Sequence, residues 1–228
     1  MPEIRVGVVG CVGRGRSFFS AFTENPHTTL TALCDVQEAA LQKQAEELGI
    51  EGVFTEYEKM VDSGAVDAVV IGTPMPLHAP MAIAALERGI HVMSEVPASV
   101  NIEESRRLVR AAERSDATYM MAENYCYIRH NVAVGEMARQ GLFGDIYFAE
   151  GAYIHELKEL NEITKWRRKW QTGINGITYP THSLGPPLQW FGRRVQKCCG
   201  YGTGHHYTDP RGDQYENEDS CFMPCRLE

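Results

Sequence analysis

The sequence predicts an α/β fold, a doubly wound parallel sheet followed by an α+β region, and three observations carry this prediction. Short apolar runs of strand length recur between residues 4 and 122. Segments with helical periodicity separate these runs, and the connecting turns are short. This regular alternation of strand and helix is typical of a doubly wound parallel sheet.

The first elements follow in order from the N-terminus. Residues 4–10 are an apolar run that ends in glycine, which suits a buried parallel strand. We expect a short helix at residues 16–24 and a second strand at 29–35. In the next helix Leu41 and Ala45 share one face, and Gly49 is expected to end it in the left-handed conformation.

The remaining elements of the first half are signalled by caps and by further apolar runs. Thr55, followed three residues later by Glu58, predicts a capping box for another short helix. We expect strands at 66–72, 90–94 and 118–122, and helices at 77–88 and 101–115, the second opened by Asn101 with Glu104. Together these elements complete the parallel sheet, and we assign residues 1–122 to one domain.

The pattern changes in the second half, which we assign to a partial α+β domain at residues 123–228. Residues 146–156 alternate as a long strand, and residues 160–170 are polar and rich in tryptophan. A loop leading into a helix is expected at 176–191, with strands at 194–203 and 219–227. The chain ends inside a predicted strand, so we expect a fragment of a domain with a large, open, mainly antiparallel sheet.

Composition excludes several classes of function. The 228 residues carry a formal net charge of −8, which argues against nucleic acids and anionic membrane surfaces as partners. We expect no leader peptide, and no run of about 18 apolar residues suggests a membrane span. The seven cysteines do not match zinc-binding spacing, so no metal is predicted. We expect free thiols, with Cys11, Cys34 and Cys126 buried as small hydrophobes, and therefore a reducing cytoplasm.

The turn after the first strand reads Gly-Cys-Val-Gly-Arg-Gly, and it predicts a Rossmann-type dinucleotide site. Gly10 permits the tight turn, and Gly15 lets the following helix approach the sheet. The pyrophosphate is expected at the start of that helix, beside Gly13 and Arg14. Val12 stands where the usual pattern has its second glycine. The alternative for such a turn alone is an ordinary glycine-rich connection.

Asp35 ends the second strand, twenty residues after Gly15. At that position a carboxylate accepts hydrogen bonds from both ribose hydroxyls of the adenosine and repels a 2′-phosphate. Asp35 therefore favours NAD over NADP as the cofactor.

Further motifs resemble the glucose–fructose oxidoreductase / inositol dehydrogenase (Gfo/Idh/MocA) family from residue 4 to the end of the chain. They are Thr-Pro-Met-Pro-Leu-His at 73–78 and Gly-Ile-His-Val at 89–92 before Glu-Val-Pro at 95–97. The resemblance implies that Thr73 and Pro74 lie beside the cofactor. It also implies an active-site lysine at the middle of the tripeptide, but Val96 stands there and can neither donate nor titrate.

One branch of that family, the NAD-dependent α-N-acetylgalactosaminidases, is more similar still. The matching stretches are residues 120–127, 141–144, 153–156 and 179–186, and that branch also tends to carry Glu-Val-Pro. In those enzymes the Tyr and His of Tyr-Pro-Thr-His belong to the substrate site. By this resemblance, Tyr179 and His182 are the candidate catalytic and substrate-binding residues.

Each remaining candidate has a structural alternative. Glu95 lines the cofactor cleft or caps the region of the Asn101 helix, and His78 contacts the cofactor or packs beside the Thr-Pro turn. His155 contacts substrate from the first long strand of the second domain, or only packs there. Two further candidates, Asn124 for the cofactor and Tyr125 for the substrate, follow the sixth strand, where such sheets bind ligands. The basic run at 165–169 is a solvated face or supplies an arginine to a sugar or phosphate.

These residues suggest three functions. The first is an NAD-dependent oxidoreductase that transfers a hydride from a sugar or sugar derivative, with His182 as base and Tyr179 as relay. The second is an NAD-dependent glycosidase that oxidises the sugar transiently at carbon 3 and then eliminates the aglycone. The third is a catalytically idle NAD- or sugar-binding protein. For the whole protein we expect a homo-oligomer.

Overall fold

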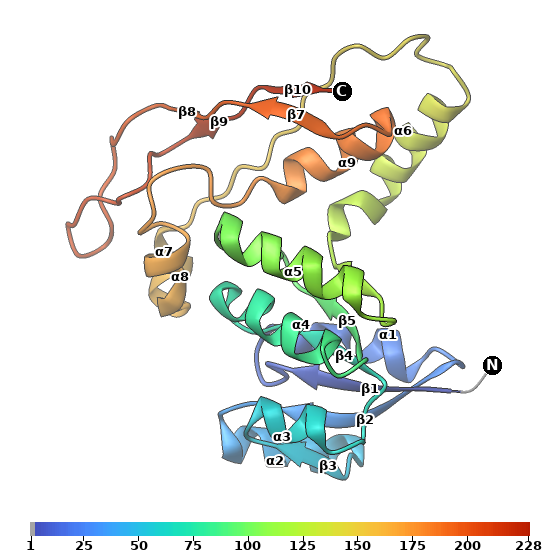
Figure 1. The fold of residues 1–228 in the computed structure, drawn as a ribbon. Helices are drawn as coiled ribbons and strands as arrows, with labels where there is room; N and C mark the ends of the chain where they lie inside the picture. Colours follow the sequence, from blue (N-terminus) through green and yellow to red (C-terminus); the bar gives the residue numbers. More distant parts are fainter. Residues whose placement is uncertain (1–2) are drawn as a thin grey trace. The chain divides into compact units, whose positions relative to one another are not determined.

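The computed structural model describes residues 3–228. The chain divides into two compact units, Met1–Ala122 and Glu123–Glu228. Figure 1 shows the chain as a ribbon. The first unit is a parallel sheet covered by helices, and the second combines helices with short antiparallel strands. The predicted fold class is confirmed.

Six parallel strands form the sheet of the first unit, in the order β3-β2-β1-β4-β5-β6. Their bounds are β1 Ile4–Val9, β2 Thr28–Cys34, β3 Gly52–Phe54, β4 Ala68–Ile71, β5 His91–Ser94 and β6 Tyr119–Met121. The chain continues to one side as far as β3 and then crosses over to β4, on the other side of β1. The order therefore reverses between β1 and β4, and ligands of open α/β sheets bind at such a switch point.

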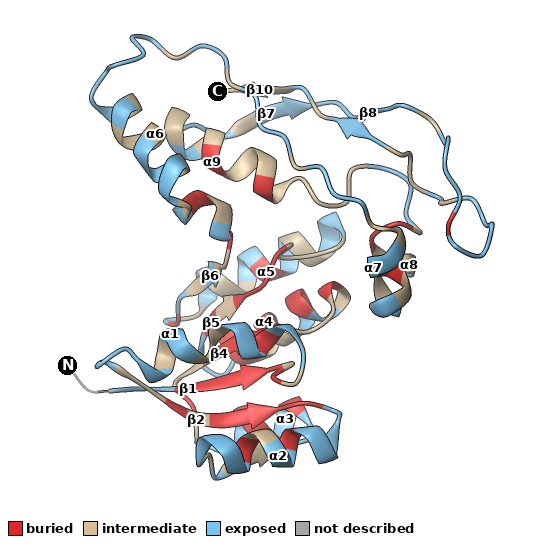
Figure 2. Cartoon of the chain, turned by 180° about the vertical axis from the view of Figure 1, so that it is seen from behind, coloured by how far each residue is buried: buried red, intermediate tan, exposed pale blue. Residues whose placement is uncertain are grey.

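Helices cover both faces of this sheet because neighbouring strand residues point to opposite sides. The helices are η1 Arg14–Phe18, α1 Phe19–Thr23, α2 Glu38–Leu48, α3 Tyr57–Asp62, η2 Met75–Leu77, α4 His78–Leu86 and α5 Ile102–Arg114. Val8 belongs to a core cluster that includes Leu41 of α2, whereas Val9 belongs to a cluster that includes Leu86 of α4. Helices α4 and α5 lie side by side (green in Figure 1), and the buried strands are red in Figure 2.

Two of the predicted helix ends are confirmed and one is wrong. Gly49 ends α2 with φ +68°, and the side chain of Asn101 accepts the Glu104 N–H (2.8 Å) at the start of α5. The capping box at Thr55 does not form. Helix α3 begins after Glu56, whose carboxylate instead binds the Lys59 ammonium group (2.5 Å).

The second unit contains η3 Asn124–Tyr127, α6 Arg129–Arg139, α7 Lys158–Ile163, α8 Lys165–Trp170 and α9 Thr181–Phe191. Its strands form two antiparallel pairs, β7 Val195–Cys198 with β10 Cys225–Leu227, and β8 Tyr201–Gly202 with β9 Cys221–Phe222. Helix α9 packs on α6, where the Trp190 indole donates to the Asn131 carbonyl (3.1 Å) and Gly135 gives the indole room.

The predicted strand at 146–156 is wrong for this chain. All of these residues are described, and none of them pairs with a strand. A strand is stabilised by its ladder of hydrogen bonds, and an alternating sequence alone does not provide a partner. Tyr147 and Ile154 accordingly remain 95% and 86% exposed.

Among residues 3–228, no helix combines the length and the apolar character needed to cross a bilayer.

Gly15 lies where the first helix meets the sheet, and we predict that Gly15→Ala destabilises the first unit. An added Cβ would lie 2.8 Å from the Gly10 carbonyl oxygen and 2.9 Å from the Val9 carbonyl oxygen, and backbone cannot rotate away. Overpacking of this kind costs about 1–3 kcal/mol. Urea unfolding measures the loss.

The control is Arg16→Ala in the same short helix, because the Arg16 side chain is exposed and its loss leaves the packing against the sheet unchanged. Equal stability of the two variants would contradict the close approach at Gly15.

Candidate functional site

The glycine turn after β1 is closed by its own backbone. Gly10 has φ +72°, and a Cβ there would lie 2.6 Å from the Gly72 carbonyl oxygen at the end of β4. The N–H groups of Gly13 and Gly15 both donate to the Gly10 carbonyl oxygen, at 3.1 and 2.9 Å. Only glycine satisfies both the left-handed φ and the close approach at Gly10.

Val12 does not block the turn, although it replaces a glycine of the usual pattern. Its half-buried side chain packs against the core cluster of β1 and β2, and its N–H donates to Asp35 Oδ2 (3.0 Å). Gly13 is exposed and leaves open the space that a Cβ would fill. The residues of the turn therefore fit a dinucleotide, because Gly13 leaves the backbone of the turn open to a ligand.

Asp35 follows β2 and is 8% exposed. Its Oδ2 accepts the Val12 N–H, and its Oδ1 accepts the Gln37 N–H (3.0 Å). Each carboxylate oxygen can accept a further hydrogen bond, so the side chain retains acceptors for ribose hydroxyls. The same carboxylate thus anchors the glycine turn to the second strand.

Glu95 binds the glycine turn from the other side. Its Oε1 accepts from Arg14 Nε (2.5 Å), and its Oε2 accepts the Val96 N–H (2.9 Å). Glu95 is 7% exposed, whereas the Arg14 side chain is about half exposed. The capping interpretation of Glu95 is wrong, because the helix that follows is capped by its own Asn101.

His78 ties together the two motifs that follow β4 and β5. Its ring is 2% exposed, and its two nitrogens lie 2.8 Å from the carbonyl oxygens of Thr73 and Pro97. The ring therefore packs beside the Thr-Pro turn and fixes its position, with Thr73 and Pro74 left half-buried.

A buried pair of ionisable side chains lies in the second unit. His182, in the first turn of α9, places Nδ1 2.6 Å from Oε1 of Glu123, which precedes η3. The two residues are 8% and 5% exposed. Glu123 Oε1 also accepts the Tyr125 N–H (3.0 Å), which fixes the carboxylate in place.

The surroundings of Glu123 decide which form of this pair is present. Burial raises the pKa of the carboxyl, but the hydrogen bonds from His182 and from the Tyr125 N–H contribute to a larger lowering, so the net pKa falls. An ionised carboxylate only accepts hydrogen bonds, and His182 Nδ1 must then carry the proton. In the neutral ring this leaves the Nε2 lone pair available as a base.

Aromatic rings surround His182. Tyr125 stacks on the imidazole, with centroids 4.2 Å apart and planes 15° apart. Tyr179 and Tyr153 meet it edge-on at 5.1 and 4.7 Å. His155 continues the cluster through Tyr153, at 4.4 Å. Four predicted residues of the second half, Tyr125, His155, Tyr179 and His182, are thus brought together.

Two glycines allow these segments to approach one another. A Cβ on Gly185, one turn after His182, would lie 3.0 Å from both Glu123 Cγ and Cys126 Sγ. A Cβ on Gly151 would overlap the Ser183 carbonyl oxygen. Side chains at either position would push α9 away from Glu123 or from the segment that carries Tyr153.

Sequence reasoning assigned no role to Glu123 or Tyr153. Glu123 is 59 residues away from His182, and no periodicity links them. The available signal was the position of Glu123 directly after β6, at the carboxyl edge of the sheet where ligands bind. Asn124, predicted to contact the cofactor, is exposed at the start of η3.

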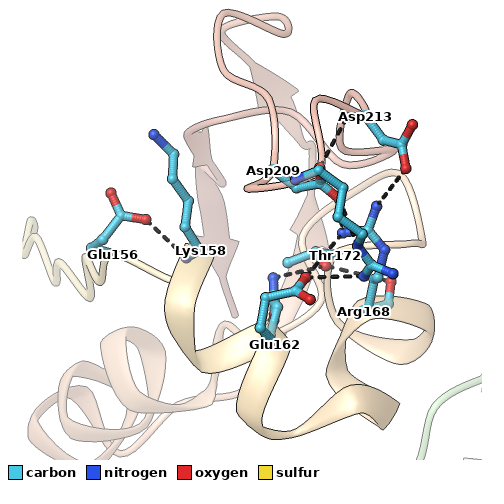
Figure 3. Close-up of polar contacts among 9 residues, drawn as sticks. Glu156, Lys158, Glu162, Arg168, Thr172, Asp209 and Asp213 are labelled. Carbon is cyan, nitrogen blue, oxygen red and sulfur yellow. Dashed lines mark hydrogen bonds and ion pairs between the residues drawn. The ribbon is translucent and has the colours of Figure 1, made fainter.

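Figure 3 shows a second polar cluster, formed by Arg168 with Glu162, Asp209 and Asp213. The Asp209 side chain is fully buried. Burial raises the pKa of the Asp209 carboxyl. The backbone N–H groups of residues 213 and 211, together with Arg168, lower this pKa by a larger amount, so the net pKa is lowered. The solvated-face interpretation of the basic run is therefore wrong for Arg168, which joins α8 to the loop at 209–213.

The cysteines predicted to be buried are buried. Cys11, Cys34 and Cys126 are 0%, 3% and 8% exposed, and burial raises the pKa of Cys11 and of Cys34 to about 12. Such thiols stay protonated at neutral pH and behave as small hydrophobes. Within residues 3–228, no three His, Cys, Asp or Glu side chains converge as metal ligands.

The fold and the glycine turn are those of a dinucleotide-binding domain, and comparison with known families agrees. Residues 4–123 match the Gfo/Idh/MocA oxidoreductase family with an NAD-binding Rossmann fold, and the chain belongs to this family. Residues 127–195 match the C-terminal domain of glycosyl hydrolase 109.

Curated relatives also include proteins of glycosyl hydrolase family 109. The chain is 39% identical over 204 residues to an α-N-acetylgalactosaminidase of Shewanella oneidensis, covering 83% of this chain and 44% of the relative. A glycosyl hydrolase family 109 protein 1 of Shewanella sp. strain ANA-3 shows the same identity and coverage. The chain therefore spans less than half the length of these relatives.

Solved structures share the fold. The WlbA dehydrogenase of Bordetella pertussis, in complex with NADH and UDP-GlcNAcA, gives a TM-score of 0.81 at 26% identity, covering 98% of this chain and 67% of that one. The scyllo-inositol dehydrogenase of Lactobacillus casei, with NAD(H) and scyllo-inositol, gives 0.81 at 23% identity, covering 99% and 66%.

We predict that Glu123→Gln makes the free energy of unfolding depend less on pH in the acid range. Folding lowers the pKa of the Glu123 carboxyl, so the ionised carboxylate stabilises the folded protein. This stabilisation is complete at pH values above the pKa that Glu123 has in the unfolded chain. It is lost as the pH falls through the pKa that Glu123 has in the folded protein. At pH 7 the variant should lose about 1–3 kcal/mol of unfolding free energy, the usual loss for a buried charged hydrogen bond. Below about pH 4 the gap to wild type should narrow.

Urea unfolding from pH 7 to pH 3 checks this prediction. Glu159→Gln, an exposed glutamate of the same unit, is the control and should follow wild type throughout. A constant gap between Glu123→Gln and wild type at every pH would contradict an ionised Glu123.

Proposed function

We propose that the protein is an NAD-dependent oxidoreductase that acts on a sugar or sugar derivative. The observation that carries the proposal is the hydrogen bond between Glu123 and His182 at 2.6 Å, which orients a base among aromatic rings. The family of the chain supports the cofactor. Because the chain spans part of its relatives, the activity belongs to the whole protein.

The cofactor would be held by the first unit. The glycine turn, Gly10 to Gly15, would hold the pyrophosphate, and Asp35 would accept hydrogen bonds from the adenosine ribose. Arg14, Thr73, Pro74 and Glu95 would border the site, and His78 would hold the Thr-Pro turn in place. A contact between Asn124 and the cofactor stays a prediction. NAD supplies the hydride acceptor for the reaction, and the charge of Asp35 disfavours NADP.

His182 would act as the base. Its Nε2 takes the proton of the sugar hydroxyl as the hydride leaves the same carbon, and the imidazolium that forms is stabilised by ionised Glu123. Tyr179, whose ring edge meets the imidazole, would relay or donate a proton from its hydroxyl. Tyr125 and His155 would contact the sugar. The aromatic faces suit a substrate ring with C–H surfaces and a polar rim.

A glycosidase is the second candidate, and two observations favour it. Val96 is 5% exposed and occupies the position of the family lysine, so the proton relay of an ordinary dehydrogenase lacks that group. The second unit matches glycosyl hydrolase 109. In this route NAD would supply the oxidation at carbon 3 and the later reduction. The carbon 3 ketone would acidify the proton on carbon 2, a base would remove that proton, and the aglycone would leave with the C1–O electrons. Water would then add its oxygen to carbon 1 and a proton would return to carbon 2 before the ketone is reduced.

Product analysis on the full-length protein separates the candidates. Net NADH formation with free sugars supports the dehydrogenase. Cleavage of an aryl glycoside, with solvent deuterium at carbon 2 and no net NADH, supports the glycosidase. Cofactor binding with neither activity supports an idle binding protein and contradicts the proposal.

We predict that His182→Ala lowers turnover by about 10²-fold or more, because the base is removed. Steady-state rates of the full-length variant measure the effect. His130→Ala, an exposed histidine on α6, is the control and should keep the wild-type rate. A normal rate for His182→Ala would exclude this residue from the mechanism.

We predict that Asp35→Ala weakens NAD binding and relaxes discrimination against NADP. Titration calorimetry with both nucleotides measures the two affinities. Asp35→Asn keeps one oxygen acceptor without the charge, so it should lose selectivity more than NAD affinity. Asp116→Ala, an exposed carboxylate of the same unit, is the control. Unchanged selectivity in both Asp35 variants would contradict the assignment.

We also propose that the protein acts in the cytoplasm, binds no nucleic acid and forms a homo-oligomer when full length. The free cysteines support a reducing compartment. Exposed Phe143, Tyr147 and Phe148 line a shallow apolar pocket and support burial against further protein. Light scattering of the full-length protein tests the oligomeric state, and localisation of a tagged copy tests the compartment.

A further inference from the structure

Two cysteines face each other across the β7–β10 ladder. Strands β7 and β10 lie side by side in Figure 1 and are antiparallel. Cys198 is the register partner of Cys225. Both thiols are free, with Cys198 exposed and Cys225 half-buried. Neither residue is used by the proposed function.

Backbone hydrogen bonding defines the kind of pair that they form. The Cys199 N–H donates to the Pro224 carbonyl oxygen (3.2 Å). Successive N–H groups of a strand point to alternate sides, so the Cys198 N–H points away from β10. Cys198 and Cys225 are therefore a non-hydrogen-bonded pair, whose Cα atoms are about 4.5 Å apart. This separation lies within the range of about 4.4–6.8 Å found in disulfides.

The two thiols differ in access and in charge environment. Cys198 is exposed and can be approached directly by a small reagent. Burial raises the pKa of the Cys225 thiol, and the neighbouring Cys198 raises it further. Cys198 is thus suited to react first with a small disulfide, and Cys225 is suited to attack the mixed disulfide that then forms on Cys198.

We propose that Cys198 and Cys225 form a dithiol site that low-molecular-weight disulfides, such as oxidised glutathione, convert into a cross-strand disulfide. The Cys198 thiolate attacks one sulfur of the small disulfide, forms a mixed disulfide and releases one small thiolate. The Cys225 thiolate then attacks the Cys198 sulfur and displaces the second small thiolate. The two protein thiols lose two electrons and two protons, and the small disulfide becomes two thiols.

The other cysteines are not placed to compete for this reaction. Cys221 lies opposite Gly202 in the β8–β9 ladder, so it has no thiol across from it. Cys199 is adjacent to Cys198, and neighbouring side chains along a strand point to opposite faces. The remaining three cysteines are buried in the cores of their units.

Mass spectrometry of the folded, reduced protein after incubation with oxidised glutathione tests the proposal. Wild type should lose two hydrogens without keeping an adduct. Trypsin cleavage after Lys197, Arg211 and Arg226 gives peptides 198–211 and 212–226, which should be joined. Persistent glutathione adducts without joined peptides, or no reaction, would overturn the proposal.

Serine variants identify the two sulfurs. Cys225→Ser should trap the mixed disulfide on Cys198, at a level at least about tenfold above wild type, because the intramolecular step is lost. Cys198→Ser should abolish the joined peptides. The matched controls Cys199→Ser and Cys221→Ser should form the disulfide as wild type does, and failure of either control would contradict the assigned pair.

Unfolding provides a second control on the same samples. In urea the strand register is lost, so the four cysteines of these peptides should pair in a mixture. If the folded protein gives the same mixture, the ladder does not direct the pairing and the inference is wrong.

Discussion

The second unit depends on one hydrogen bond, from His182 Nδ1 to Glu123 Oε1. The bond joins residues 59 positions apart, holds the start of α9 against η3 and fixes the orientation of the imidazole. An ionised carboxylate and an imidazole are both costly to bury alone, and pairing removes most of that cost. The rings of Tyr125, Tyr153 and Tyr179 pack around His182. The same contact is therefore both a packing constraint and the source of an oriented base.

Glycine serves the same purpose in both units, which is to let backbone approach backbone where function is expected. In the first unit Gly10 and Gly15 bring the turn and its helix onto β1 and β4, and Asp35 fastens the turn through the Val12 N–H. In the second unit Gly185 lets α9 reach Glu123. These contacts explain why the turn accepts a valine at position 12. The Val12 side chain packs against the core, and the backbone of Gly13 is the part of the turn that stays open to a ligand.

Much of the first unit could be predicted from the sequence, because its signals are local. The apolar periodicity of the strands and helices depends on a few neighbouring residues. The same is true of the end of α2 at Gly49 and of the start of α5 at Asn101. The three-residue β3 was missed because so short a run has no readable period. In the second unit the strand at 146–156 failed because a strand requires a partner that the alternating pattern does not specify. Tyr179 and His182 were found only by resemblance, and Glu123 needs the fold to bring it to His182.

The central claim is that Glu123 sets the tautomer of His182, and nitrogen NMR of the histidine-labelled protein tests it most directly. The account predicts that neutral His182 carries its proton on Nδ1 and keeps an unprotonated Nε2, and that Glu123→Gln disturbs this preference. A neutral ring protonated on Nε2 in the wild-type protein would contradict the account, because no lone pair would then remain for the substrate proton.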